Sequence, residues 1–106
     1  MNLFTRFDPN ASEEQLMTLL QTPGLRLERI ISTGQSSPPG FWYDQEETEW
    51  VTLLSGEARL DTETGPVTLQ PGDTLLLPAH FRHRVDYTSK EPPCIWLCLF
   101  FPEESR

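Results

Sequence analysis

Two short segments of this chain each place one acid–base side chain on an otherwise apolar strand. Glu49 opens the run Glu-Trp-Val-Thr-Leu-Leu, and His83 opens the run His-Arg-Val-Asp-Tyr. Because side chains alternate between the two faces of a strand, Glu49 shares a face with Val51. His83 likewise shares a face with Val85 and Tyr87. An unpaired buried charge is costly, so these groups need partners. The pattern predicts that Glu49 and His83 approach each other inside a β-structure, across a metal ion or within hydrogen-bond reach.

Both segments lie within longer patterns of glycine and proline. Six residues separate Glu49 from Gly56, and five separate Gly72 from Pro78, with His83 five positions further on. These spacings resemble the two motifs of the cupin family, which read Gly-x5-His-x-His-x(3,4)-Glu-x6-Gly and Gly-x5-Pro-x-Gly-x2-His-x3-Asn. The resemblance covers nearly the whole chain. It implies an all-β fold, the cupin-type jelly-roll barrel.

The first motif is incomplete here, because both of its histidines are replaced. With the four-residue spacing before Glu49, the histidine positions hold Trp42 and Asp44. With the three-residue spacing, they hold Tyr43 and Gln45. Among these replacements, Asp44 is the one hard metal ligand.

The family's His/His/Glu/His cup therefore implies a reduced metal set of Asp44, Glu49 and His83. Two carboxylates and one imidazole would suit iron, manganese, zinc or nickel, with open coordination positions. Additional donor candidates at the cup are Tyr43, Gln45 and His80. The alternative is a cup without metal, in which Glu49 and His83 pair with each other or with a neighbouring Arg or Tyr. His80, which replaces the glycine of the second motif, is alternatively a turn residue before a strand.

Aromatic and cationic side chains flank these candidates. Trp42 belongs to the run Phe-Trp-Tyr, whose rings suit core packing or the mouth of a barrel that binds a small organic ligand. Arg82 and Arg84 alternate outward from His83. They either balance nearby acids or place one guanidinium at the rim, where it would bind a substrate carboxylate. Tyr87 replaces the asparagine of the second motif and completes the expected rim.

The elements that must position these residues form a single predicted domain, 1–106, with an N-terminal segment at 1–24 and a barrel at 25–101. Ser12 to Gln15 has the pattern of a capping box, and the leucines that follow form a helical stripe ended by Pro23. We therefore expect a short N-terminal helix on the outside of the barrel. Ten prolines and six glycines punctuate the chain, as is typical of all-β proteins. The predicted strands cover residues 25–32, 41–44, 48–54, 57–61, 67–69, 74–78, 83–87 and 94–101.

The composition of the chain excludes some classes of binding partner. A formal net charge of −8 and a pI near 4.6 argue against nucleic acid or an anionic membrane as a partner. No stretch is long and apolar enough to span a bilayer, so we expect a cytoplasmic protein. Cys94 and Cys98 lie on one predicted strand about 13 Å apart, which is too far for a disulfide. We expect two buried thiols.

Two predicted strands, within 50–54 and 94–101, are apolar on both faces. A barrel strand needs only its inner face covered, so the outer faces must meet the N-terminal segment or another subunit. Cupins commonly dimerise through such faces, and the resemblance therefore implies a homodimer.

Three functions remain open at this point. The first is a metal-dependent oxygenase or isomerase that acts on a small polar molecule, with the metal as Lewis acid. Alternatively, the chain is a metal-free module that binds or senses a small ligand, or a structural domain with a vestigial site. A cup plugged by Trp42 or Tyr43 would favour the structural domain. No helix-turn-helix pattern accompanies the barrel, which disfavours a DNA-binding regulator.

Overall fold

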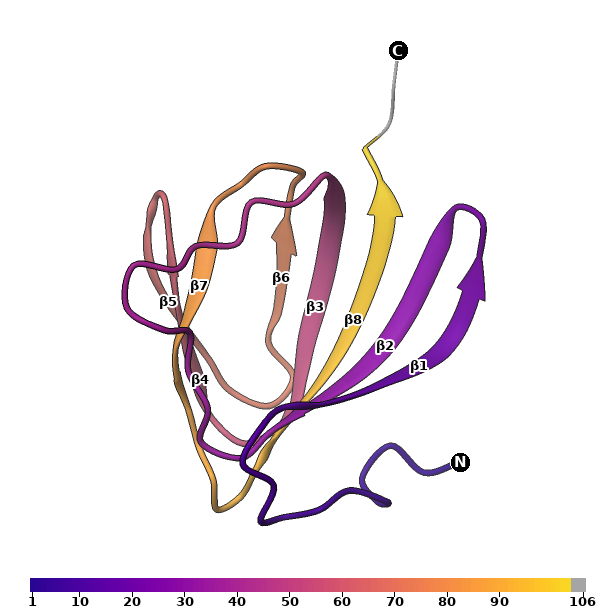
Figure 1. Ribbon diagram of the computed structural model, residues 1–106, viewed down its shortest axis with the longest axis vertical. Helices are drawn as coiled ribbons and strands as arrows, with labels where there is room; N and C mark the ends of the chain where they lie inside the picture. Colours follow the sequence, from indigo (N-terminus) through magenta and orange to yellow (C-terminus); the bar gives the residue numbers. More distant parts are fainter. Residues whose placement is uncertain (104–106) are drawn as a thin grey trace.

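Two antiparallel sheets face each other across one interior in the computed structural model, which describes residues 1–103 (Figure 1). One sheet has five strands in the order β1-β2-β8-β3-β6, and the other has three in the order β5-β4-β7. The strands are β1 (Gln15–Thr22), β2 (Leu25–Ser32), β3 (Glu47–Ser55), β4 (Ala58–Thr62), β5 (Gly65–Leu69), β6 (Thr74–Leu77), β7 (His83–Thr88) and β8 (Cys94–Pro102). This architecture confirms the predicted all-β jelly-roll barrel.

Seven of the eight predicted strands correspond to observed strands, and the prediction at 41–44 is wrong. Only a single bridge forms there, between Tyr43 and His83. Pro38 and Pro39 precede this segment and lack the backbone N–H groups that a ladder needs. The segment therefore runs along β7 as a connection that touches the sheet once.

The predicted N-terminal helix is also wrong, because the leucine-rich segment forms the edge strand β1. β1 pairs antiparallel with β2, with a register shift between Thr18 and Leu20. That irregularity explains the misleading spacing of the leucines, which mimics a helical stripe. A helix this short is marginal by itself, whereas a strand completes its hydrogen bonds against β2. Residues 1–103 contain no helix long and apolar enough to cross a membrane.

The core lies on the inner faces of the two sheets. Along β8, Trp96, Cys98 and Phe100 are buried and face the interior, whereas Leu97 and Leu99 between them are half-buried on the outer face. The remaining buried hydrophobic side chains of the core cluster are Val51, Leu53, Ala58, Leu60, Leu69, Leu77 and Cys94. Both cysteines are buried free thiols.

Gly56 is required where the chain turns from β3 to β4. Its φ of 86° lies in the left-handed region, and a Cβ atom there would lie 2.7 Å from the carbonyl oxygen of Pro93 and 2.8 Å from Cα of Cys94. Both conformation and space therefore demand glycine at this position.

Candidate functional site

A cavity of about 430 Å³ opens between the two sheets. Its wall combines apolar side chains with a group of polar and charged ones. The polar lining residues are Glu14, Arg26, Glu28, Tyr43, Gln45, Glu49, His83 and Cys98, and the apolar ones are Leu16, Ile30, Val51, Leu60, Leu77, Val85, Trp96 and Phe100. This mixture of an apolar wall with a few polar groups is typical of a binding site for a small organic molecule.

Glu49 and His83 converge inside this cavity from β3 and β7. Their relative exposures are 8% and 5%, and Nε2 of His83 lies 3.9 Å from Oε1 of Glu49. The distance exceeds that of a direct hydrogen bond, which would need about 2.7–3.2 Å. The two side chains therefore face each other across a gap that one further atom could bridge.

The orientation of His83 is set by its neighbours. Its Nδ1 lies 3.1 Å from the carbonyl oxygen of Phe81. A carbonyl oxygen only accepts hydrogen bonds, so Nδ1 carries the proton in this contact. Neutral His83 consequently presents an unprotonated Nε2, an acceptor, to the cavity.

Burial raises the pKa of Glu49, an effect that the positive charge of His83, when its imidazole is protonated, opposes in part. Gln45 donates a hydrogen bond from Nε2 to Oε1 of Glu49 over 3.1 Å, and this contact favours the carboxylate. The thiol of Cys98 adjoins the same carboxylate. Its own pKa is well above the ordinary range, mainly because of burial, so Cys98 remains a neutral thiol.

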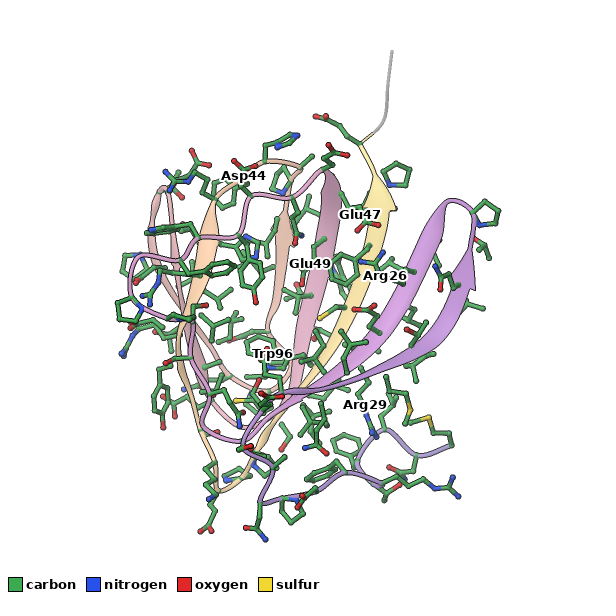
Figure 2. The ribbon with its side chains drawn as sticks, viewed as in Figure 1. Arg26, Arg29, Asp44, Glu47, Glu49 and Trp96 are labelled. Atoms are coloured by element: carbon green, nitrogen blue, oxygen red, sulfur yellow. The ribbon has the colours of Figure 1, made fainter. Side chains whose placement is uncertain are left out.

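Arg26 enters the cavity from β2, but its guanidinium is already occupied. Its Nε donates to Glu28 over 2.8 Å, and its Nη1 and Nη2 donate to the two carboxylate oxygens of Glu47 over 3.0 and 2.9 Å. The same group lies 4.4 Å above the ring centroid of Phe100. Figure 2 shows Arg26 and Glu47 on either side of β8, with Glu49 further along β3. Arg26 thus bridges β2 and β3 across β8.

A second polar chain lies at another part of the wall. The indole Nε1 of Trp96 donates to Oγ of Ser32 over 3.0 Å, and that hydroxyl donates to Oε2 of Glu14 over 2.7 Å. The buried indole N–H is thereby satisfied without a ligand, and the ring of Trp96 forms an apolar surface of the cavity.

Asp44, the third member of the predicted metal set, lies away from the other two. It is on the connection at the upper rim in Figure 2, where its Oδ1 accepts a hydrogen bond or ion pair from Nδ1 of His80 at 2.7 Å. More than half of each side chain is exposed to solvent. This pairing raises the pKa of His80. His80 therefore serves as a rim partner of Asp44 and does not line the cavity.

The donors present do not fit the metal cup that the family resemblance implies. Within residues 1–103, no three His, Cys, Asp or Glu side chains converge so as to hold a metal ion. Of the three predicted ligands, Glu49 and His83 face one another and Asp44 does not. The adjacent Cys98 is held as a thiol, whereas a metal ligand would be a thiolate. The ligand role of Asp44 stays a prediction without geometric support.

Of the predicted additional donors and rim residues, some line the cavity and others lie outside it. Tyr43 and Gln45 line the cavity, whereas Trp42, Arg82, Arg84 and Tyr87 are outside its lining. Arg82 lies over the ring of Trp42 at 5.3 Å. Arg84 contacts Asp61, Asp86 and the carbonyl oxygen of Ser37.

Tyr87 does not share the inward face of His83, which corrects the expected alternation. The pairing of β7 with β4 is irregular between residues 85 and 87, so that Val85 pairs with Leu60 but Tyr87 pairs with Arg59. This bulge turns Tyr87 outward, where the residue is 44% exposed and its ring centroid lies 5.8 Å from the Arg59 guanidinium carbon.

Three charged residues that line the cavity were not predicted from the sequence, namely Arg26, Glu28 and Glu14. The sequence contains a pattern that could have indicated Arg26 and Glu28, because they alternate with Ile30 on the same face of one strand. Charged residues at alternate positions of a strand normally indicate a solvated face, and here the same parity faces the cavity.

The chain matches the family model described as Cupin domain over residues 28–100. The chain belongs to the cupin family. A solved structure from Ralstonia eutropha JMP134, of a protein provisionally named a mannose-6-phosphate isomerase, is 46% identical and covers 96% of both chains with a TM-score of 0.93.

A more distant solved structure shares the fold. KdgF from Halomonas sp. is 19% identical, with a TM-score of 0.75 over 98% of this chain and 94% of that one. Among curated proteins, the RCS-specific HTH-type transcriptional activator RclR of Escherichia coli K12 is 40% identical over 47 residues. That stretch covers 43% of this cupin but only 16% of the activator's length.

Proposed function

We propose that this cupin domain binds a small polar organic molecule in the cavity between its sheets, and that Glu49 and His83 contact it. The observation that carries the proposal is the convergence of these two buried side chains, 3.9 Å apart, in a cavity of about 430 Å³. Cavities of this size accommodate small organic ligands. A vestigial cup has less support: Trp42 lies outside the cavity lining, and Tyr43 forms part of the wall but leaves a cavity of about 430 Å³ open.

Isomerisation is the enzymatic reaction that this arrangement supports best. An aldose–ketose isomerisation moves a proton between neighbouring carbon atoms, and it needs a side chain that removes and returns that proton. Burial raises the pKa of Glu49, which brings the group closer to the pH at which it would exchange protons. The Ralstonia protein that is 46% identical carries the name of an isomerase, which is consistent with this reaction class.

A second candidate is ligand sensing without turnover. The observation that favours it is the 40% identity over 47 residues with part of a transcriptional activator. Both candidates require binding in the cavity, and only the isomerase requires a chemical change in the bound molecule.

Methyl-labelled NMR with mannose as the probe tests both steps. We expect mannose to shift the methyl resonances of Val51 and Val85, which line the cavity. His83→Gln should weaken this effect. The control His80→Gln should not, because His80 lies at the rim on Asp44. Deuterium appearing at C2 of mannose in heavy water would favour the isomerase, shifts without deuterium would favour sensing, and no shift at all would contradict the proposal.

We further propose that the domain is a homodimer through the outer face of its five-stranded sheet. One residue from each strand forms a continuous apolar line across that face, which we call the outer row: Leu20, Leu27, Leu99, Trp50 and Leu76. The end members Leu20 and Leu76 are 53% and 54% exposed.

The size of this face suits a second copy of the chain. Five strands about 4.8 Å apart, each of about eight residues at about 3.3 Å per residue, form a surface of roughly 600 Å². A stable interface buries about 800 Å² on each partner. Residues 3–6 cover part of this face, where the buried Arg29 donates to the carbonyl oxygens of Thr5 and Arg6. The area left for a second copy is therefore smaller than the whole face, and the outer row forms its apolar part.

A further inference from the structure

We infer that the cavity selects ligands that are not anionic and that donate hydrogen bonds, such as an unphosphorylated sugar, a polyol or an amine. This inference rests on the proposed function and names the ligand class of the same site. The name of the Ralstonia protein refers to a phosphorylated sugar. The inference does not use that name, and it predicts that this cavity prefers sugars without a phosphate group.

The first line of evidence is the hydrogen-bonding state of His83. Its side chain is more than nine-tenths buried, and within the described residues its Nε2 has no hydrogen-bond partner, although it lines the cavity. Because Nδ1 carries the proton toward Phe81, Nε2 is an acceptor when the ring is neutral. The group that faces it, Oε1 of Glu49, is an acceptor as well.

Two acceptors 3.9 Å apart are best satisfied by a donor placed between them. A ligand hydroxyl or ammonium group supplies such a donor, since it can donate to Nε2 of His83 or to the carboxylate of Glu49. An ionised phosphate or carboxylate oxygen supplies only acceptors, so it would leave Nε2 of His83 without a donor. It would also add negative charge beside Oε1 of Glu49, which already accepts a hydrogen bond from Gln45. Such mismatches are costly in a buried site.

The second line of evidence is the balance of charge around the cavity. The acidic residues Glu14, Glu28 and Glu49 line it, and Arg26 is the single Arg or Lys among its lining residues. The guanidinium of Arg26 is held by Glu28 and, in a fork, by Glu47. The planar fork with which an arginine normally binds a phosphate is therefore occupied by a carboxylate.

Both lines of evidence point to the same selectivity. An anionic ligand would meet an excess of carboxylates and an arginine that is already neutralised, whereas a neutral or cationic donor would meet the free acceptor Nε2 of His83 and the carboxylate of Glu49. Like-charge contacts in a site of this kind disfavour the wrong partner strongly.

A matched series of three sugars tests the inference: mannose, mannosamine and mannose 6-phosphate. We expect the first two to shift the Val51 and Val85 methyl resonances with affinities at least ten-fold higher than that of the phosphate. If mannosamine exceeds mannose, an amine is the preferred donor, and the reverse order assigns a hydroxyl. Binding of mannose 6-phosphate as tightly as mannose would overturn the inference but leave the proposed function standing. No response to any of the three would contradict the proposed function itself.

A charge variant examines the role of Arg26 directly. Glu47→Gln removes the carboxylate that occupies the fork of its guanidinium, and we expect it to increase the affinity for mannose 6-phosphate several-fold. The control Glu57→Gln removes the same charge at an exposed position between β3 and β4, and we expect no such gain. An equal gain in both variants would show that only the net charge of the protein matters, which would overturn the assignment to the cavity.

Discussion

The ring of Tyr43 stacks on the imidazole of His83, with ring centroids 5.1 Å apart and planes inclined by 20°. The two residues also exchange backbone hydrogen bonds, from Tyr43 N–H to His83 C=O over 2.7 Å and in the reverse direction over 3.2 Å. Tyr43 lies on the connection before β3, and His83 opens β7. The pair therefore attaches this connection to the wall of the cavity and holds the imidazole in place.

Removing the stacked ring should loosen His83. We expect Tyr43→Leu to lower the free energy of unfolding by about 1 kcal/mol beyond the loss of buried area, the usual contribution of an aromatic pair. Mannose binding should weaken together with it. Tyr43→Phe keeps the ring and should retain most of both properties. Urea unfolding and the NMR titration measure them, and identical behaviour of the Leu and Phe variants would contradict a role for stacking.

The buried carboxyl group of Glu49 should make stability depend on pH. Burial raises its pKa above the ordinary value of 4.5, so the folded protein holds this proton more tightly than the unfolded chain does. The stabilising contribution is therefore fully present below pH 4.5 and is lost as the pH rises through the folded-state pKa.

Glu49→Gln has no such proton to lose. Its free energy of unfolding should therefore increase relative to that of the wild type as the pH is raised from about 4.5 toward neutrality. Urea unfolding at several pH values measures the difference, with Glu57→Gln as an exposed control. A difference that decreases with rising pH would show that the pKa of Glu49 is shifted in the opposite direction.

Metal analysis tests the ligand set that the family resemblance implies. Because Asp44 is bound to His80 at the rim, we expect Asp44→Asn to leave the metal content of untagged protein unchanged. We also expect that content to be well below one ion per chain, since no three such ligands converge within residues 1–103. Stoichiometric metal that is lost in Asp44→Asn would restore the three-residue site.

Two glycines with similar backbone angles should differ in their tolerance of a methyl group. Gly56 and Gly72 have φ values of 86° and 94°, but only Gly56 has backbone atoms within contact distance of a built Cβ. Gly72→Ala should cost about 1–2 kcal/mol of stability from the left-handed conformation alone. Gly56→Ala adds a steric cost of about 1–3 kcal/mol. Equal losses in thermal or urea unfolding would argue against a tight approach of Gly56 to β8.

A charge placed in the outer row should prevent dimerisation. Leu76→Lys introduces an ammonium group at an exposed end of the row, where we expect it to convert a dimer into a monomer without unfolding the chain. Tyr87→Lys, at an exposed aromatic on the other sheet, is the control. Light scattering at micromolar concentration reports the mass. A monomeric wild type, or a dimer in Leu76→Lys, would contradict the proposed interface.

Most of the fold could be predicted because strand patterns are local. Alternation of apolar residues located seven strands, and turn residues such as Gly72 marked their ends. The N-terminal segment could not be assigned in the same way, since the leucine spacing that suggests a helix also arises in a strand with the irregularity between Thr18 and Leu20. The pairing partner, β2, decides between the two.

The candidate site was predictable only in part, for a related reason. Parity along single strands indicated that Glu49 and His83 face an apolar interior. The contact between Arg26 and Glu47 depends on strand order, because β8 lies between β2 and β3 in the sheet. The outward turn of Tyr87 depends on a bulge that appears only when β7 pairs with β4.

Strand β3 carries the proposed ligand contact and the proposed dimer contact on consecutive residues, Glu49 inside and Trp50 outside. A one-residue insertion or deletion within such a strand exchanges its two faces. It would turn Trp50 inward and Glu49 outward, so both surfaces would be lost in a single event. Descendants of this chain should therefore tolerate length changes in the connection before β3, and evolve within β3 by replacement of individual residues.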